Sequence, residues 1–384
     1  MTQSRWNIEA LAILLLTAAL VTVSAAYVLE KARSSKSGSG EGASVHAPGQ
    51  VIHWRLVTAW PKGFPGLGTA PERFADMVRE MSGGRLDIQV FGANELVPAM
   101  GVFDVVSSGS VEMGHAGAYY WKGKAPAAQF FTTVPFGMTA QEMNAWLYYG
   151  GGMELWRELY ARFDLIPLAG GNTGVQMPGW FNKEIHSLAD VQGLKIRLPG
   201  LAGEVFGRIG ATAVNIPGGE LYTSLRTGVI DAVEWVGPYN DMAMGFHEAA
   251  RYYYYPGWHE PGSTLEMIVN RQAFERLPPD LQAIIVTAAR AANQDMLDEY
   301  TAKNIEALRE LVDTHKVQLR RLPDDVLRSL KKASDEALQA LVADDPFARR
   351  VYASYSHFAT GVAQYHRISE QAYLEARSMV DEQP

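Results

Sequence analysis

Segments with strand and helix signals alternate along this chain, and that order limits its possible folds more than any other feature. Residues 51–58 and 86–91 alternate apolar and polar side chains, as half-buried strands do, and residues 111–116 read as a third strand. Helices are predicted between them, at residues 70–81 and 98–109. Strand, helix, strand, helix, strand is the order of a parallel sheet covered by helices.

A second set of the same kind follows the first. Its short strands are predicted at residues 165–170, 173–176, 193–198, 213–216 and 230–236, with helices at 201–209 and 219–227. At 384 residues the chain also exceeds the roughly 250–300 residues at which a single hydrophobic core stops growing. We therefore expect an α/β fold of two lobes with a central ligand cleft between them.

Long helices are expected after the second set. Residues 278–315 predict one long helix, residues 317–322 a short strand, and a further helix begins at Pro323. A final helix over 347–380 carries apolar residues mostly three and four apart, which is close to heptad spacing. This seam comprises Phe347, Val351, Tyr355, Phe358, Val362, Tyr365 and Ala372. The seam either packs on its own lobe or forms the contact of a homodimer.

The N-terminal segment predicts that the folded part lies outside the cytoplasm. Residues 10–29 carry no charge, and the small residues within 23–26 suit a signal peptidase. The same run is nearly long enough to span a bilayer, so residues 1–33 are either a signal peptide or a membrane anchor. The Gly- and Ser-rich residues 34–50 form a flexible linker. We expect an exported, periplasmic protein, tethered to the cytoplasmic membrane if the apolar segment is retained.

Composition argues against several function classes. The 42 acidic and 34 basic residues give a net charge of -8, which disfavours binding to nucleic acid. The absence of cysteine excludes disulfides, thiolate metal sites and a cysteine nucleophile. The sequence contains no GxxxxGK[ST], HExxH or GxSxG motif. We therefore expect a binding protein rather than an enzyme and assign no catalytic residue.

Residues 170–262 carry the most specific pattern in the chain. They contain LADVQGLKIR at 188–197, GELYTSL at 219–225 and GVIDAVEW at 228–235. In these motifs the chain resembles the solute-binding subunits of TRAP transporters (tripartite ATP-independent periplasmic transporters), over about residues 51–370. The resemblance implies a periplasmic-binding-protein-like architecture and a receptor that delivers its ligand to integral-membrane transporter subunits.

The folded part of the chain is expected to divide into two lobes and a C-terminal helix. Residues 51–172 form the first lobe, which part of 263–345 completes, and residues 173–262 form the second lobe. Residues 346–384 form the C-terminal helix, with its homodimer contact as one interpretation.

One set of residues resembles the subgroup that binds 2-oxo- or 2-hydroxy-monocarboxylates together with a metal ion. The set is Gln176, Arg197 and Glu234 with Trp235. On residue type alone, Arg197 and Glu234 could equally form ordinary ion pairs. The resemblance implies that Arg197 holds the carboxylate, as a planar guanidinium can through two parallel hydrogen bonds. It also implies that the Gln176 amide oxygen, the Glu234 carboxylate and the Trp235 carbonyl bind Na⁺ or Ca²⁺, which take oxygen ligands.

Charge balance favours a small monocarboxylate such as pyruvate or lactate. Glu234 and the ligand supply two negative charges, which Arg197 and one Na⁺ balance in a dry cleft. Ca²⁺ would require another nearby carboxylate such as Glu260, which we also expect to form a hydrogen bond across the cleft. Tyr119 is expected to line the cleft and to donate its hydroxyl to the ligand.

Three other functions fit parts of this pattern. A membrane-tethered sensory domain would use the same cleft for ligand binding. A secreted hydrolase would need a nucleophile and a base, which the sequence does not reveal. A binding protein of an ABC transporter would share the two lobes but not the pattern at residues 193–197 and 234–235.

Overall fold

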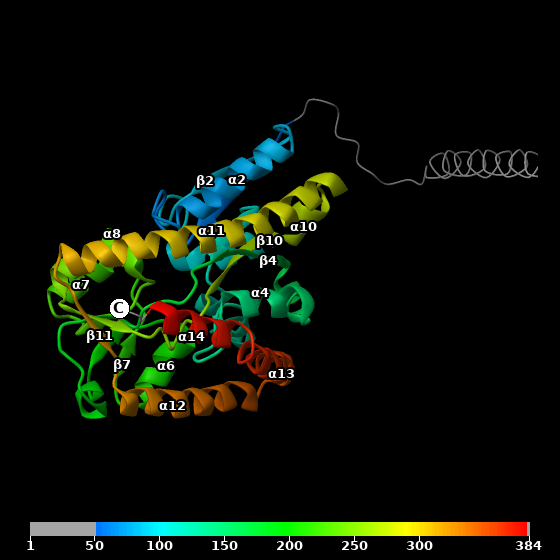
Figure 1. Ribbon diagram of the computed structural model, residues 1–384. Helices are drawn as coiled ribbons and strands as arrows, with labels where there is room; N and C mark the ends of the chain where they lie inside the picture. The colour runs from blue at the N-terminus through cyan, green and yellow to red at the C-terminus, as the bar shows by residue number, and fades with distance from the viewer. Residues whose placement is uncertain (1–50, 382–384) are drawn as a thin grey trace, which may run out of the picture. The chain divides into compact units, whose positions relative to one another are not determined.

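The computed structural model describes residues 51–381 of the chain. The predicted signal peptide or anchor at residues 1–33 and the linker at 34–50 lie outside the described residues. Within residues 51–381, no helix is both long and apolar enough to cross a membrane. Two β-sheets with helices packed against them give the two-lobed α/β architecture that the sequence predicts (Figure 1).

The first sheet has the strand order β2-β1-β3-β10-β4. Its strands are β1 (Ile52–Thr58), β2 (Leu86–Phe91), β3 (Met113–Ala116), β4 (Leu165–Asn172) and β10 (Thr264–Asn270). β1 pairs in parallel with β2 and β3, as the alternating pattern predicts. β10 lies antiparallel between β3 and β4, because the chain returns there after building the second sheet. The sheet is therefore mixed, which corrects the prediction of a parallel sheet.

The second sheet has the strand order β11-β9-β5-β8-β6-β7. Its strands are β5 (Gly179–Phe181), β6 (Lys195–Arg197), β7 (Thr212–Val214), β8 (Ala232–Val233), β9 (Tyr252–Tyr255) and β11 (Gln318–Arg321). β6 pairs in parallel with β7 and β8, whereas β5 is antiparallel to β8 and β9. β11 joins the edge beside β9, so the chain contributes to this sheet again long after residue 262.

Two of the predicted strands differ in the structure. The strand predicted over 230–236 is reduced to the two residues of β8, and residues 173–176 form no strand. Beyond Val233 the backbone leaves the sheet, because the N–H groups of Val236 and Gly237 donate to the carboxylate of Asp241, each at 3.1 Å. A buried side chain thus satisfies donors that a strand partner would otherwise take.

Helices flank both sheets. In chain order they are α2 (Thr69–Met81), α3 (Val102–Ser107), α4 (Ala140–Tyr149), α5 (Gly152–Tyr160), α6 (Gly200–Arg208), α7 (Leu221–Arg226), α8 (Pro238–Ala243), α9 (Phe246–Ala249), α10 (Arg271–Glu275), α11 (Pro279–Asp313), α12 (Asp324–Ala343), α13 (Pro346–His366) and α14 (Glu370–Asp381). The helix predicted over 98–109 begins instead with a 3₁₀ turn at Ala99–Gly101, followed by α3.

The 35-residue helix α11 connects the two lobes. Leu281 and Ile285 near its start are buried in the core of the first sheet. Farther along, the hydroxyl of Tyr300 donates to Asn240 of α8 at 2.7 Å. Figure 1 shows α11 running past β10 and β4 towards α8. One rigid element therefore contacts both halves of the molecule.

The single final helix predicted over 347–380 is two helices, α13 and α14, with a break at residues 367–369. The first part of the apolar seam packs on the chain itself. Val351 and Tyr355 are buried, and the Tyr355 hydroxyl accepts a hydrogen bond from the Met138 N–H at 2.9 Å. Tyr365 at the end of α13 is 61% exposed, so the seam leaves the core before α14 begins.

A carboxyl group lies in the core of the first lobe. Glu266 on β10 is fully buried, and it accepts hydrogen bonds from the Trp121 indole N–H at 2.5 Å and the Tyr160 hydroxyl at 2.7 Å. Burial raises the pKa of Glu266 from 4.5 to about 8, although both hydrogen bonds favour the ionised form. At neutral pH this side chain therefore holds a proton in the folded state.

This proton gives the fold a predictable pH dependence. Between about pH 5 and 8 the unfolded chain has lost the Glu266 proton while the folded chain keeps it, so rising pH favours unfolding. The slope is roughly 1.4 kcal/mol per pH unit, and the contribution levels off above the folded-state pKa. We expect Glu266→Gln to remove this term, so its stability relative to wild type should rise with pH across that window. Denaturant unfolding at pH 5, 6.5 and 8 measures the difference, with exposed Glu80→Gln as a control. Parallel curves for wild type and Glu266→Gln would contradict the assignment.

Candidate functional site

A narrow cavity lies between residues of the two lobes. Trp60 and Leu67 follow β1, Tyr119 and Tyr120 follow β3, and Arg197 ends β6. The complete lining is Trp60, Leu67, Tyr119, Tyr120, Thr173, Gln176, Arg197, Trp235, Val236 and Leu265. The cavity thus brings together Tyr119, Gln176, Arg197 and Trp235 from the predicted set.

Two of the three guanidinium nitrogens of Arg197 are bonded within the protein. The side chain is 2% exposed, and its Nη1 donates to the Glu234 carbonyl at 2.6 Å and to Glu234 Oε2 at 3.1 Å. Its Nε donates to the Ile216 carbonyl at 3.4 Å, and the guanidinium lies 5.1 Å from the centre of the Trp235 ring. No hydrogen bond within residues 51–381 uses Nη2, which leaves that group for a ligand carboxylate.

Glu234 is a fully buried carboxyl group with one oxygen unused. Its Oε2 accepts from Arg197, while Oε1 has no hydrogen-bond partner among the described residues. Burial raises the pKa of Glu234 to about 8, an effect that the Arg197 charge only partly opposes. A second positive charge at Oε1 would stabilise the ionised form.

His259 lies beside that unused oxygen. Its Nε2 is 3.3 Å from Glu234 Oε1, and the ring is fully buried. Burial lowers the pKa of His259 to about 4, so the ring is neutral at pH 7. Sequence reasoning missed this residue, because the histidines show no ligand spacing along the chain. Its one sequence signal is its position next to Glu260.

Hydrogen bonds fix which way the Gln176 amide faces. Its Nε2 donates to Glu260 Oε2 at 2.8 Å and to the Thr173 hydroxyl at 3.0 Å. Its Oε1 is buried and has no partner within residues 51–381. Glu260 also accepts a hydrogen bond from the Ser263 hydroxyl, and burial, followed by the charge of Glu234, raises the pKa of Glu260 to about 7.

These groups suit a hard cation. Gln176 Oε1 and Glu234 Oε1 lack partners, and no hydrogen bond within the described residues reaches the Trp235 carbonyl oxygen. Amide, carboxylate and carbonyl oxygens are the ligands that Na⁺ and Ca²⁺ take. Glu234, His259 and Glu260 also present donor atoms within 4.8 Å of one another. The residues of the predicted metal set therefore fit a bound cation.

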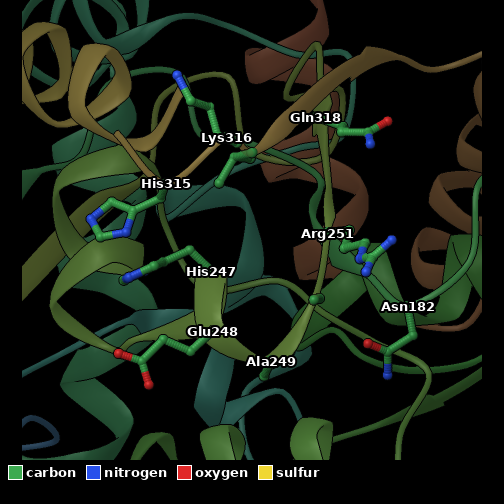
Figure 2. A pocket seen from close by; sticks show the side chains of 10 residues that line it. Asn182, His247, Glu248, Ala249, Arg251, His315, Lys316 and Gln318 are labelled. Carbon is green, nitrogen blue, oxygen red and sulfur yellow. The ribbon is translucent and has the colours of Figure 1, made fainter. Parts of the chain in front are cut away.

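A second hollow lies elsewhere on the second lobe, where β9 and β11 begin. Its lining includes His247 and His315, whose ring centres are 4.2 Å apart, together with Arg251, Lys316 and Glu248. Figure 2 shows the His247 and His315 side chains pointing to the same side, while those of Lys316 and Arg251 point elsewhere. None of the predicted site residues lines it. We therefore place the candidate site in the narrow cavity.

The chain is similar to known solute-binding proteins over most of its length. Residues 56–345 match the family described as bacterial extracellular solute-binding protein, family 7. A monocarboxylate 2-oxoacid-binding periplasmic protein of Nostoc sp. is 43% identical over 330 residues, which cover 86% of this chain and 90% of that protein.

Two solved structures are similar in sequence and fold. One is a TRAP periplasmic solute-binding protein from Colwellia psychrerythraea with bound calcium and pyruvate. It is 45% identical, with a TM-score of 0.83, over 85% of this chain and 100% of that one. The other, from Pseudoalteromonas atlantica, holds sodium and pyruvate. It is 46% identical, with a TM-score of 0.83, over 85% of this chain and 99% of that one.

Proposed function

This chain belongs to family 7 of the bacterial extracellular solute-binding proteins, and on that premise we propose that it binds a 2-oxo monocarboxylate such as pyruvate together with Na⁺ or Ca²⁺. It is an exported transport receptor and not an enzyme, which removes the secreted hydrolase from consideration. Its ligand passes to the membrane subunits of a TRAP transporter. The family also separates it from the ABC-type binding proteins.

The arrangement around Arg197 is the observation that carries this proposal. A buried guanidinium with a free Nη2 faces the same cavity as Gln176 and Trp235, and Glu234 pairs with it. We assign the ligand carboxylate to Arg197 and the cation to Gln176 Oε1, Glu234 Oε1 and the Trp235 carbonyl. A bound cation supplies positive charge for these oxygens and for the oxygens of the ligand.

Charge balance supports either cation. Arg197, Glu234, a monocarboxylate and Na⁺ sum to zero while Glu260 is protonated. With Glu260 ionised, Ca²⁺ gives the same neutral sum, and Glu260 is fully inside the site, bonded to Gln176. Neutrality matters because an uncompensated charge in a dry site is costly. Similar proteins hold calcium in one structure and sodium in another, which agrees with this count.

Capture is expected to draw the lobes together. Tyr119 and Leu265 line the cavity from the first lobe, while Arg197 and Trp235 line it from the second. A ligand that contacts both sides favours the closed form, because the open form cannot make both sets of contacts. We assign Tyr119 the hydroxyl donor and Glu260 the hydrogen bond that spans the cleft.

The first test removes the cation and, separately, weakens the hydrogen bonds from residue 197 to the ligand carboxylate. We expect pyruvate binding, measured by titration calorimetry, to be lost from chelator-treated protein and restored by CaCl₂ or NaCl. Arg197→Lys should weaken pyruvate binding by about 10- to 100-fold, since a charge-assisted hydrogen bond contributes roughly 1.5–3 kcal/mol. Arg55→Lys, at the surface pair with Glu112, is the matched control. Pyruvate binding that ignores cations would refute the proposed site, and unchanged uptake after deletion of the protein would favour a sensory domain.

The second test concerns ligand size. The apolar part of the cavity is small, with Leu67 and Leu265 each 2% exposed. Leu265→Ala should shift the affinity ratio towards 2-oxoacids with longer apolar chains, by roughly tenfold or more per accommodated methylene. Leu168→Ala removes an equally buried side chain of the first lobe outside the cavity, so it should lower stability without moving the ratio. Equal ratios in both variants would contradict the assignment of Leu265 to the ligand's apolar end.

We also propose that α14 forms a homodimer contact with a second copy of the chain. On α14, Tyr373, Leu374 and Met379 are 64%, 49% and 71% exposed. Large apolar side chains on a helix that its own lobe does not cover suit a partner helix of the same kind.

Ending the chain after Arg367 removes this surface but keeps the buried part of α13. We expect sedimentation velocity at micromolar concentrations to change from dimer to monomer on truncation, with ligand binding retained. Ile305→Lys alters an apolar side chain that is equally exposed on α11 and should leave the dimer intact. A wild-type chain that sediments as a monomer would remove this proposal without affecting the ligand site.

A further inference from the structure

The peptide that carries the Trp235 carbonyl is held by a residue outside every sequence motif. Asp241 in α8 is fully buried. Its Oδ1 accepts hydrogen bonds from the backbone N–H groups of Val236 and Gly237, each at 3.1 Å. Two backbone donors directly beyond Trp235 are therefore tied to one carboxylate oxygen.

The other oxygen of Asp241 is anchored in the second lobe. Its Oδ2 accepts from the Trp180 indole N–H at 3.1 Å and from the Tyr253 hydroxyl at 2.8 Å. Trp180 lies on β5 and Tyr253 on the adjacent strand β9, with their rings stacked at 4.2 Å. The carboxylate is thus fixed in position by the sheet before any ligand arrives.

Peptide geometry then sets the direction of the Trp235 carbonyl. The Trp235–Val236 bond is trans, since the described chain has its cis bond at Tyr255–Pro256. In a trans peptide the N–H and the C=O point in opposite directions. Because the Val236 N–H points at Asp241, the Trp235 C=O points away from it.

The neighbouring carbonyls are already occupied. The Glu234 carbonyl accepts from Arg197 Nη1 at 2.6 Å, and the Val236 carbonyl accepts from the Met177 N–H at 2.9 Å. Between them, the Trp235 carbonyl is left without a hydrogen bond inside residues 51–381. Of these three successive carbonyl groups, only that of Trp235 is free within the described part of the chain. The N–H of the same peptide, which belongs to Val236, is bonded to Asp241.

We infer that Asp241 is a positioning residue that orients the Trp235 carbonyl for the cation. Asp241 touches neither the cation nor the ligand. It acts through the Val236 N–H. The Trp235 carbonyl therefore has the orientation that cation binding requires before the cation arrives, and the loop does not have to rearrange. This inference rests on the proposed function, because it assumes that the Trp235 carbonyl binds the cation.

A purely structural role for Asp241 makes a different prediction. Its bonds to Val236 and Gly237 also tie the start of α8 to the segment before it, and such buried hydrogen bonds contribute stability whether or not a cation binds. The two roles separate when cation affinity is measured apart from the stability of the cation-free protein.

The first experiment compares two buried carboxylates in the full chain. The NH₂ group of an Asn at position 241 would face either the two backbone N–H groups or the Trp180 N–H, so the four donors could no longer all be accepted. We therefore expect Asp241→Asn to weaken Ca²⁺ binding at saturating pyruvate by about 10- to 100-fold, the usual effect of disturbing a group that orients a metal ligand. Glu266→Gln is the control, because Glu266 also accepts from one tryptophan and one tyrosine but lies in the first lobe. Glu266→Gln should change the melting temperature while Ca²⁺ affinity stays within about twofold of wild type.

A second experiment needs only the wild-type protein. Trp235-Val236 is the single Trp-Val pair in the sequence, so ¹³C-carbonyl tryptophan and ¹⁵N-valine labelling gives one NMR signal for this peptide. We expect the Val236 amide proton to be protected from exchange without cation. We also expect the Trp235 carbonyl shift to move when Ca²⁺ and pyruvate are added.

The outcomes of these experiments are distinct. A wild-type protein that binds pyruvate without a cation would defeat the proposed function itself. A cation-dependent wild type whose Ca²⁺ affinity is unchanged in Asp241→Asn would overturn this inference alone. A Val236 amide proton that exchanges freely would overturn it too, even if Asp241→Asn did not fold.

Discussion

The buried pair of Arg197 and Glu234 is the interaction on which the site depends. Two charges of opposite sign in a dry interior rarely stabilise a fold, because the desolvation of each ion offsets most of their attraction. Here the pair is also incomplete: Arg197 keeps a free Nη2 and Glu234 a free Oε1. An apolar pair of similar volume would pack as well. The contribution of this pair is instead a site in which Arg197 has a donor left for an anion and Glu234 has an acceptor left for a cation.

Two of the crossings between the lobes pass through this same site. The chain leaves the first sheet after β4 along Thr173 to Gln176 and returns to it after β9 along Glu260 to Ser263. These crossings are bonded to each other, with the Thr173 N–H donating to the Ser263 carbonyl at 3.1 Å and the Gln176 N–H donating to the Glu260 carbonyl at 3.0 Å. Side chains that we assign to the cation site are therefore attached to the segments about which the lobes would move.

Local sequence patterns predicted the strands and helices that depend on neighbouring residues. They failed where contacts between segments far apart in the chain determine the structure. The alternation at 51–58 and 86–91 predicted β1 and β2 within a residue, because one face of each strand is buried. The antiparallel direction of β10 depends on the route of the chain after residue 262, which no local pattern records. The assignment of Arg197, Gln176 and Glu234 to the candidate site came from the family resemblance. His259 and Asp241 were not predicted, because their places beside the candidate site arise only from contacts made in the folded chain.

Asp241 and Glu266 show why buried carboxylates are hard to interpret from sequence. Each accepts hydrogen bonds from one tryptophan and one tyrosine, and burial raises the pKa of each, to about 7 and about 8. Glu266 makes only those contacts, so it can remain a protonated group of the core. Asp241 adds two backbone N–H groups beside the Trp235 carbonyl, and this difference connects the core of the second lobe to the cation site. The two acids therefore differ in role because, within residues 51–381, Asp241 accepts hydrogen bonds from backbone N–H groups and Glu266 does not. The choice of Asp or Glu does not by itself distinguish a carboxyl group of the core from one that orients a metal ligand.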